Sequence, residues 1–199
     1  MWAPVSSCAF RDGSTLPLPI VIVPPRAPPS PLDLRAVFDE HFDYVWSALH
    51  RLGIHDRDLE DVAHDVFLKV HAKLAEFDAS RPMRPWLFGF AFRVARDHQR
   101  LARHQREIVG LPLDPVDPAR RADQQMEADD ERRLVETALQ SVELERRAVL
   151  LMHDVDDVSI PEIARVLEIN VNTAYSRLRL AREELAAAVT RLRRKEGAR

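Results

Sequence analysis

Four arginines in the middle of the chain are spaced to form one basic stripe along a helix: Arg93, Arg96, Arg100 and Arg103. The last three follow the first by three, seven and ten residues, steps that return to the same helix face. Guanidinium groups in such a row can hold successive phosphates of a nucleic acid. The alternative is that these arginines form a solvated basic face that binds no nucleic acid.

Aromatic residues stand directly ahead of this stripe and interleave with it: Trp86, Phe88, Phe90 and Phe92. Four aromatics in seven residues exceed what one buried helix face can hold, so we expect some of the rings to be accessible. Unpaired bases can stack on such rings, each contributing about 1–3 kcal/mol, while arginines hold the phosphates. The segment therefore predicts a surface for single-stranded nucleic acid, with a buried aromatic core as the alternative.

A second candidate site lies near the C-terminal end of the chain. Ser159 can cap a short helix that runs to Leu167, and Glu162 would complete a capping box. A turn over residues 168–170 follows, and Asn170 can cap a longer helix. This layout predicts a helix-turn-helix, with an ordinary helical hairpin as the alternative. The second helix carries side chains that can bind base edges and phosphates: Asn172, Thr173, Tyr175, Ser176, Arg177, Arg179 and Arg182.

Signs of catalysis are lacking. The chain has no glycine-rich phosphate loop, no nucleophile elbow and no paired-histidine zinc signature. Its eight histidines are scattered, and a single cysteine, Cys8, excludes an internal disulfide framework and fits a reducing compartment. We therefore expect no enzyme, no metal and no cofactor.

The elements that position these residues are helices. Apolar residues recur at three- and four-residue steps from Asp33 to Gly53, again after Asp56 or Asp58, and in a third helix that runs to about His104 with Pro85 in its first turn. No alternating stretch predicts a strand, so we expect an all-α protein of two helical modules.

Prolines and charge divide the chain. We expect a disordered proline-rich tail at 1–31, a first module at 32–106, a flexible acidic linker at 107–130, a second module at 131–192 and a basic tail at 193–199. The net charge of −3 is therefore a sum over segments in which acidic and basic residues are strongly segregated. The longest apolar run, 16–23, is interrupted by Pro17 and Pro19, so neither a transmembrane helix nor a convincing signal peptide is expected.

Two arginine-rich helical modules joined by an acidic linker resemble a bacterial sigma-70 family sigma factor of the extracytoplasmic-function (ECF) group, which keeps only regions two and four. Three segments carry the resemblance: Asp58–Val70 is similar to the segment that contacts the polymerase clamp coiled coil, Arg84–Arg100 to the promoter-melting helix, and Ser159–Arg182 to the region-four helix-turn-helix. Their order and spacing also match those of the family.

The resemblance implies a role for each matched residue. Core RNA polymerase would be bound by Glu60, Asp61, Asp65, Val66, Phe67 and Lys69, with Leu68 beside them. The minus-ten element would be bound and melted by Trp86, Arg93, Arg96, Arg100 and Arg103. The minus-thirty-five element would be read by Asn172, Thr173, Tyr175, Ser176, Arg177, Arg179 and Arg182.

The implied function is promoter recognition and transcription initiation in regulated or stress-responsive gene expression. The implied partners are core RNA polymerase, through its clamp coiled coil and flap, promoter DNA, and an anti-sigma factor. The implied location is the cytoplasm, without membrane insertion. In the free protein the two modules could pack together across the linker, and docking on polymerase would spread them.

Several positions depart from the family pattern. Arg93 stands where family members usually carry asparagine, Glu168 and Asn172 replace common glycines, and Tyr175 replaces a frequent lysine. Promoter preference and turn geometry therefore do not carry over. Two other classes of function stay open: a dimeric helix-turn-helix regulator that never joins polymerase, and a scaffold that binds only proteins. A requirement for core polymerase would separate the first of these from a sigma factor.

Overall fold

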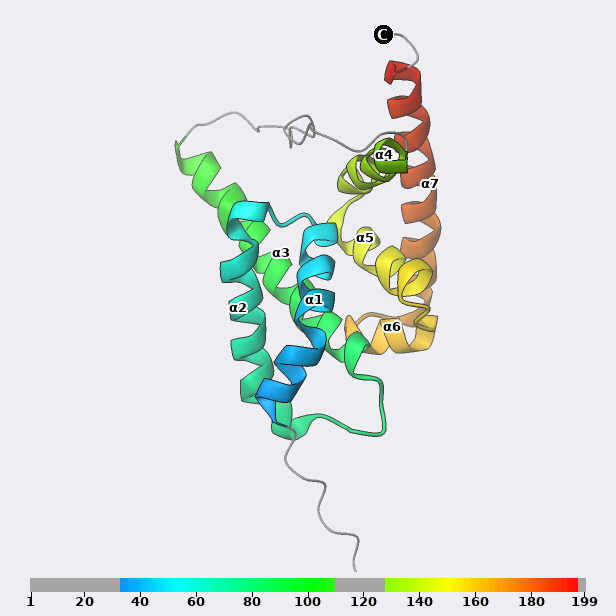
Figure 1. Cartoon of the computed structure of the whole chain (residues 1–199). Coiled ribbons are helices and arrows are strands. Elements are labelled where there is room, and N and C mark those ends of the chain that lie inside the picture. The colour runs from blue at the N-terminus through cyan, green and yellow to red at the C-terminus, as the bar shows by residue number, and fades with distance from the viewer. Residues whose placement is uncertain (1–32, 110–127, 197–199) are drawn as a thin grey trace, which may run out of the picture. The chain divides into compact units, whose positions relative to one another are not determined.

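The computed structural model describes residues 33–109 and 128–196 (Figure 1). Within these two ranges every regular element is helical, which confirms the all-α prediction. The predicted proline-rich tail, most of the predicted acidic linker and the last three residues lie outside the described residues. No helix in the two described ranges is long and apolar enough to span a membrane.

The N-terminal helices are α1 (Leu34–Leu52), α2 (Asp56–Lys73) and α3 (Met83–Val109), with a short 3₁₀ turn, η1 (Leu74–Glu76), after α2. The predicted ends of α1 are confirmed. The Asp33 side chain accepts a 3.1 Å hydrogen bond from the Arg35 N–H, and Gly53 ends the helix in the left-handed conformation at φ 95°. All three helices contact one another.

The C-terminal helices are α4 (Ala128–Gln140), α5 (Leu144–Leu150), α6 (Ile160–Val166) and α7 (Val171–Glu196), with a π-helical turn, η3 (Leu151–Val155), after α5. Helix α7 packs against α4, α5 and α6. Helices α3 and α4 extend into the two ends of the predicted linker, and α7 includes the first residues of the predicted basic tail.

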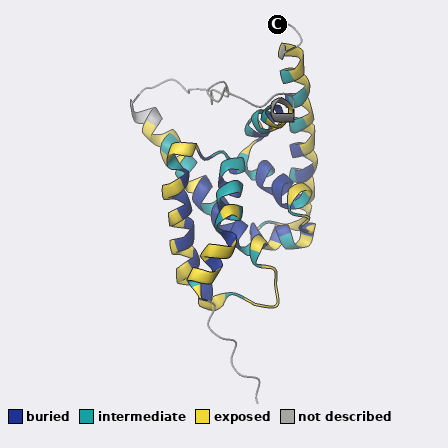
Figure 2. Cartoon of the chain, in the orientation of Figure 1, coloured by how far each residue is buried: buried dark blue, intermediate teal, exposed yellow. Residues whose placement is uncertain are grey.

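One apolar core holds these helices together, and Figure 2 shows its buried residues on α1–α3 and α5–α7. Contacts join the two groups between α1 and α4, α1 and α5, and α3 and α6. The expected packing of the two modules against each other is therefore present in this structure. Helix α3 contacts α6 of the second group as well as α1 and α2, and its sequence pattern did not predict this additional contact.

Side chains from both the N-terminal and the C-terminal helices donate hydrogen bonds to the C-terminal end of α1. Carbonyl groups in the last turn of a helix have no partner within the helix. Here they accept hydrogen bonds from three other helices: Leu52 O from Gln99 Nε2 (2.9 Å), His50 O from Gln140 Nε2 (3.3 Å) and Arg51 O from Arg147 Nη1 (3.4 Å). A Cβ atom on Gly53 would lie 2.6 Å from Gln140 Oε1, so a larger residue would have to displace that side chain as well as adopt a strained φ of 95°.

Arg147 is the one arginine in the described chain that is buried, with 5% of its surface exposed. Its guanidinium also donates to Gln140 Oε1 at 2.6 Å, Gln140 O at 2.8 Å and Val142 O at 2.7 Å. Burial lowers the pKa of Arg147 to about 10. The side chain remains charged at neutral pH, and its N–H groups donate to carbonyl oxygens. These hydrogen bonds fix the α4–α5 turn against α1.

Candidate nucleic-acid and polymerase interfaces

The aromatic cluster of α3 is more buried than the sequence predicted. Phe88, Phe90 and Phe92 are only 1%, 8% and 3% exposed. Trp86 is half-buried, and its ring lies 4.8 Å from the rings of both Phe77 and Phe90. The expectation that some of these rings are accessible holds for Trp86, whereas the three phenylalanines follow the alternative of a buried aromatic core, since α1, α2 and α6 all pack on α3. Of these four rings, Trp86 alone retains substantial exposed surface.

The arginine stripe next to these rings is accessible along most of its length. Arg96, Arg100 and Arg103 are exposed, and the Arg96 guanidinium lies 5.6 Å from the centre of the Phe92 ring. Arg93 is half-buried and lies 4.9 Å from the centre of the Phe90 ring. Cation–π contacts of this kind hold a guanidinium in place and leave its N–H groups free to donate.

Arg93 already has partners from the C-terminal helices. Its Nη1 donates to Val166 O at 3.5 Å and lies 3.6 Å from the carboxylate of Glu168. Burial lowers the pKa of Arg93, and the negative charge of Glu168 opposes that change. Nucleic acid would have to replace these contacts to reach Arg93.

The acidic face of α2 lies on the surface, as its residues predicted. Glu60, Asp61, Asp65 and Lys69 are all exposed. Val66 and Phe67, however, are 0% and 5% exposed and belong to the core, so they hold the face rather than form its surface. Leu68, with 57% exposed, is the apolar side chain that this face offers to a partner.

The helix-turn-helix has the predicted elements but only one of the two predicted caps. Asn170 Oδ1 accepts a 2.8 Å hydrogen bond from the Asn172 N–H at the start of α7, as expected. Ser159 precedes α6 but makes no capping hydrogen bond with its side chain. The predicted capping box is wrong because the Glu162 carboxylate binds the guanidinium of Arg165 one turn later instead of turning back.

Most predicted base-reading residues lie on the exposed first half of α7. Tyr175 is 58% exposed, Thr173 and Arg177 are half-buried, and the rest are exposed: Asn172, Ser176, Arg179 and Arg182. Ser176 Oγ donates to Thr173 O at 2.9 Å, a bond within the helix. This surface combines hydroxyl, amide and guanidinium donors, the groups that contact base edges and phosphates in a major groove.

Two of the three candidate DNA-binding arginines of α7 have carboxylate partners. Arg179 Nη1 lies 2.7 Å from Glu183, one turn along α7. Arg182 binds Asp154 through two bonds of 3.0 Å and 2.5 Å, and so ties α7 to η3. The bond from Arg182 is the largest cause of a lowered pKa at Asp154. Both pairs are solvent-exposed and therefore weak enough to exchange for phosphate.

No cluster of three histidine, cysteine or acidic side chains in the described ranges could hold a metal ion.

Comparison with known proteins decides the family. The model of sigma-70 region 2 matches residues 37–106, and that of sigma-70 region 4 matches residues 132–185. The ECF RNA polymerase sigma factor SigL of Mycobacterium tuberculosis is 32% identical over 150 residues, which span 74% of this chain and 84% of SigL. The chain belongs to the ECF group of sigma-70 factors.

Solved structures of sigma factors share the fold. CnrH in complex with the cytosolic domain of CnrY is 25% identical, with a TM-score of 0.55 over 79% of this chain and 87% of CnrH. The sigma factor RpoE of Bartonella quintana, in complex with the anti-sigma factor NepR, is 17% identical with a TM-score of 0.62 over 79% of this chain and 97% of RpoE. This ECF sigma factor is thus a DNA-binding initiation factor and not an enzyme, and the regulator and scaffold alternatives lose their support.

Proposed function

We propose that this sigma factor divides promoter recognition between α3 and α7. One chain carries two separate basic, donor-rich surfaces, one on a helix within the region 2 match and one on a helix within the region 4 match. That observation carries the proposal. The two modules, 32–106 and 131–192, would each bind one promoter element.

The α3 surface suits the melted minus-ten element. Trp86 offers a partly exposed ring at the start of the helix, and Arg96, Arg100 and Arg103 continue along it as an exposed basic row. A flipped or unpaired base can stack on an accessible indole, and guanidinium groups hold the backbone of the separated strand. Arg93 would join this row once it leaves Glu168.

The α7 surface suits duplex DNA at the minus-thirty-five element. Asn170 fixes the start of the helix, so Asn172, Thr173, Tyr175 and Ser176 stand at the end that enters a major groove. Arg177, Arg179 and Arg182 follow on the next turns and suit phosphates or guanine.

Core RNA polymerase would bind the acidic face of α2, through Glu60, Asp61, Asp65 and the exposed Leu68, with the buried Val66 and Phe67 holding that face in shape. Carboxylates around one apolar side chain suit a basic partner surface such as the clamp coiled coil. The C-terminal module would contact the flap.

Regulation by an anti-sigma factor in the cytoplasm completes the proposal. The solved relatives are in complexes, CnrH with the cytosolic domain of CnrY and RpoE with the anti-sigma factor NepR. By analogy, a protein of that class would hold this chain inactive until a signal requires regulated or stress-responsive transcription.

A run-off transcription assay tests the function. Bacterial core RNA polymerase, preferably from the cognate species, is incubated with a library of candidate promoters, with and without the purified chain. The proposal requires promoter-dependent transcripts that are present only when the chain is added. If a folded, inhibitor-free chain yields none, the initiation role assigned to these surfaces is wrong.

A further inference from the structure

The N-terminal half of α7 presents a short row of polar side chains to solvent. Three buried residues mark the side of the helix that packs inward: Ala174, Leu178 and Ala181. Asn172, Ser176 and Arg179 lie on the opposite side at steps of four and three residues, and all three are exposed. A helix that enters a major groove with this end would bring the row to the base edges.

Each of the three candidate DNA-binding arginines of α7 interacts with a carboxylate. The carboxylates are Glu183 for Arg179, Asp154 for Arg182 and, through its charge, Glu145 for Arg177. A guanidinium that exchanges such a carboxylate for a phosphate gains affinity, but a phosphate contact carries no sequence information. The choice of bases therefore falls to the uncharged side chains at the start of the helix.

Asn172 is the exposed carboxamide of this row. Its N–H donates to Asn170 Oδ1 at 2.8 Å, and within the described residues no hydrogen bond engages its side chain. A carboxamide holds a donor and an acceptor side by side, which match N7 and the N6 amino group of adenine. Guanine presents two acceptors at this edge, so it would satisfy only the donor half of the amide.

Two exposed side chains with apolar surface flank Asn172. Val171 and Tyr175 are 40% and 58% exposed and stand four residues apart, on one side of the helix. Apolar surface in water is unfavourable, so both side chains would gain from a partner that covers them. The methyl group of thymine is the apolar group that a major groove offers. Thymine pairs with adenine, so these two residues and Asn172 indicate the same base pair.

Ser176 adds a restriction one turn further along the helix. Its hydroxyl proton is already donated to Thr173 O at 2.9 Å, so the oxygen is left as an acceptor. An acceptor can bind the amino group of adenine or cytosine, whereas guanine and thymine offer only acceptors at this position.

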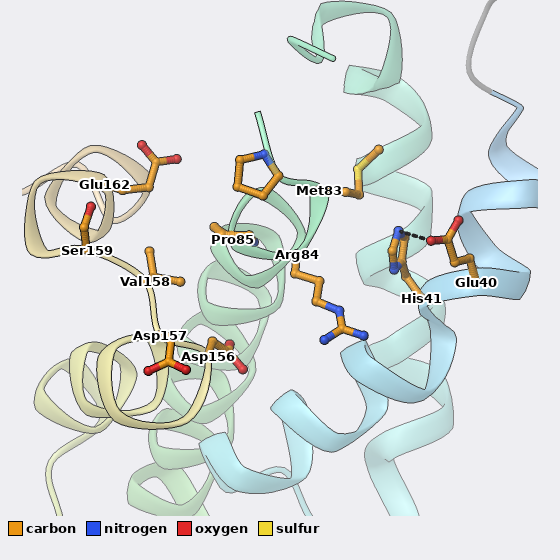
Figure 3. A pocket seen from close by; sticks show the side chains of 11 residues that line it. Glu40, His41, Met83, Arg84, Pro85, Asp156, Asp157, Val158, Ser159 and Glu162 are labelled. Atoms are coloured by element: carbon orange, nitrogen blue, oxygen red, sulfur yellow. Dashed lines mark ion pairs between the residues drawn. The ribbon is translucent and has the colours of Figure 1, made fainter. Parts of the chain in front are cut away.

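The side of the helix-turn-helix beside α6 is unsuited to DNA. Figure 3 shows a cavity of about 600 Å³ there. Its lining includes four carboxylates and one arginine: Glu40, Asp156, Asp157, Glu162 and Arg84. Carboxylates repel the phosphates of a duplex, so the duplex is directed to the outward side of α7, where the arginines lie.

We propose that α7 reads A·T base pairs, with Asn172 binding one adenine through two hydrogen bonds while Val171 and Tyr175 contact thymine methyl groups. The inference rests on the proposed binding of the minus-thirty-five element by α7. Asn172 and Tyr175 stand where the family commonly has glycine and lysine, so this preference is a property of the present chain. The arginines hold the same duplex through its phosphates.

Selection from a duplex library tests the readout. The full-length chain, free and assembled with core RNA polymerase, is incubated with duplexes that contain about eight randomised base pairs, and the bound duplexes are sequenced. We expect one position to require adenine, by about five- to 150-fold over other bases, with A·T pairs beside it. Asn172→Ala should lose the preference at that position alone. Thr190→Ala, exposed later on α7, is the matched control and should select the same sequence as the unsubstituted chain.

Modified bases test the contacts atom by atom. Placing 7-deazaadenine at the selected position removes N7 and should weaken binding of the unsubstituted chain about fivefold or more, but not that of Asn172→Ala. Uracil in place of thymine removes the methyl group and should weaken the unsubstituted chain, but not the double variant Val171→Ala with Tyr175→Ala. Asn172→Asp keeps the side-chain shape but can only accept, so its preference should move from adenine to cytosine.

Three results would overturn the inference. They are an unchanged base preference in folded Asn172→Ala, a guanine at the position that depends on Asn172, and the absence of any enriched sequence with and without polymerase. Equal binding of thymine and uracil duplexes would overturn the roles of Val171 and Tyr175. Circular dichroism establishes that each variant is folded.

Run-off transcription with core polymerase separates this inference from the proposed function. Transcription by the unsubstituted chain together with unaltered selection by Asn172→Ala would refute only the adenine readout. Absence of transcription refutes the proposed function, and selection of A·T pairs that depends on Asn172 would then describe a duplex-binding regulator that never joins polymerase.

Discussion

Tyr44 donates a 2.7 Å hydrogen bond to the carboxylate of Asp156, across 112 residues of sequence. The bond joins α1 to the residue that follows η3. Burial raises the pKa of Tyr44, and the bond to Asp156 raises it further, so the phenol keeps its proton and remains a donor. One partly buried hydrogen bond thus links the region 2 match to the region 4 match.

Loss of this bond should weaken the packing of the two modules. Tyr44→Phe leaves the half-buried Asp156 carboxylate without its donor, which should lower the free energy of unfolding by about 1–3 kcal/mol. Urea denaturation measures the loss, and Tyr175→Phe on exposed α7 is the matched control. In a double-mutant cycle with Asp156→Ala, the effects of the two substitutions on stability should not add. Simple additivity would show that the bond contributes nothing to stability.

Asp154 and Asp156 should respond to acid in opposite directions. The bond from Arg182 lowers the pKa of Asp154, so its stabilising contribution is complete above the unfolded value of about 3.9 and is lost as pH falls through the lower native value. Burial raises the pKa of Asp156, so its ionised form destabilises the native state, and this effect disappears as pH falls through the native value toward about 3.9.

Urea titrations between about pH 7 and about pH 3 can separate the two carboxylates. The stability difference between the unsubstituted chain and Asp154→Asn should hold down to about pH 4 and then shrink. For Asp156→Asn, the unsubstituted chain should gain stability relative to the variant at pH values above about 4, as Asp156 takes up its proton. The same pH response in both variants would contradict the assigned causes.

Charge reversal on α2 should separate polymerase binding from folding. Asp61→Lys with Asp65→Lys places two positive charges on the exposed acidic face, and we expect affinity for core polymerase to fall by about tenfold or more, since each tenfold is 1.4 kcal/mol. Thermal unfolding should change little, because both side chains are exposed. Glu136→Lys on α4 is the matched reversal and should leave affinity unchanged. Equal affinity in the folded double variant would remove α2 as the docking face.

The local parts of this fold could be predicted from the sequence, whereas the contacts between distant segments could not. Asp33, Gly53 and Asn170 act on backbone groups within a few residues, so their caps follow from local chemistry. The Ser159–Glu162 box failed because Arg165, one turn away, competes for the Glu162 carboxylate.

The sequence left open whether the three phenylalanines on α3 are buried, because the periodicity of α3 does not show that α6, more than sixty residues away, packs on this helix in addition to α1 and α2. Arg147 was missed for the same reason, since the sequence gives no sign that α1 carbonyls lie beside it. Glu168 did carry a signal: an acidic residue at a turn position where the family commonly has glycine. Only the structure shows that Glu168 pairs with Arg93.

Removing α7 arginines should change the salt dependence of duplex binding. If Arg177 and Arg179 each neutralise one phosphate, alanine at either position should reduce the slope of log K against log salt by about 0.9. Binding of promoter duplex by the full-length chain is measured over a series of salt concentrations. Arg191→Ala, on the exposed later part of α7, should leave the slope unchanged. A weaker affinity with an unaltered slope would mean that the arginine does not contact phosphate.

Transcription from intact and pre-melted promoters tests most directly whether α3 opens DNA while α7 anchors it. Trp86→Ala with Arg96→Ala should abolish run-off transcripts from duplex promoters, and a template whose minus-ten bases are mismatched should restore them, because strand separation no longer depends on α3. Arg177→Ala with Arg179→Ala should reduce transcripts from both templates alike. The account is contradicted if pre-melting fails to rescue the α3 variant, or if it rescues the α7 variant equally well.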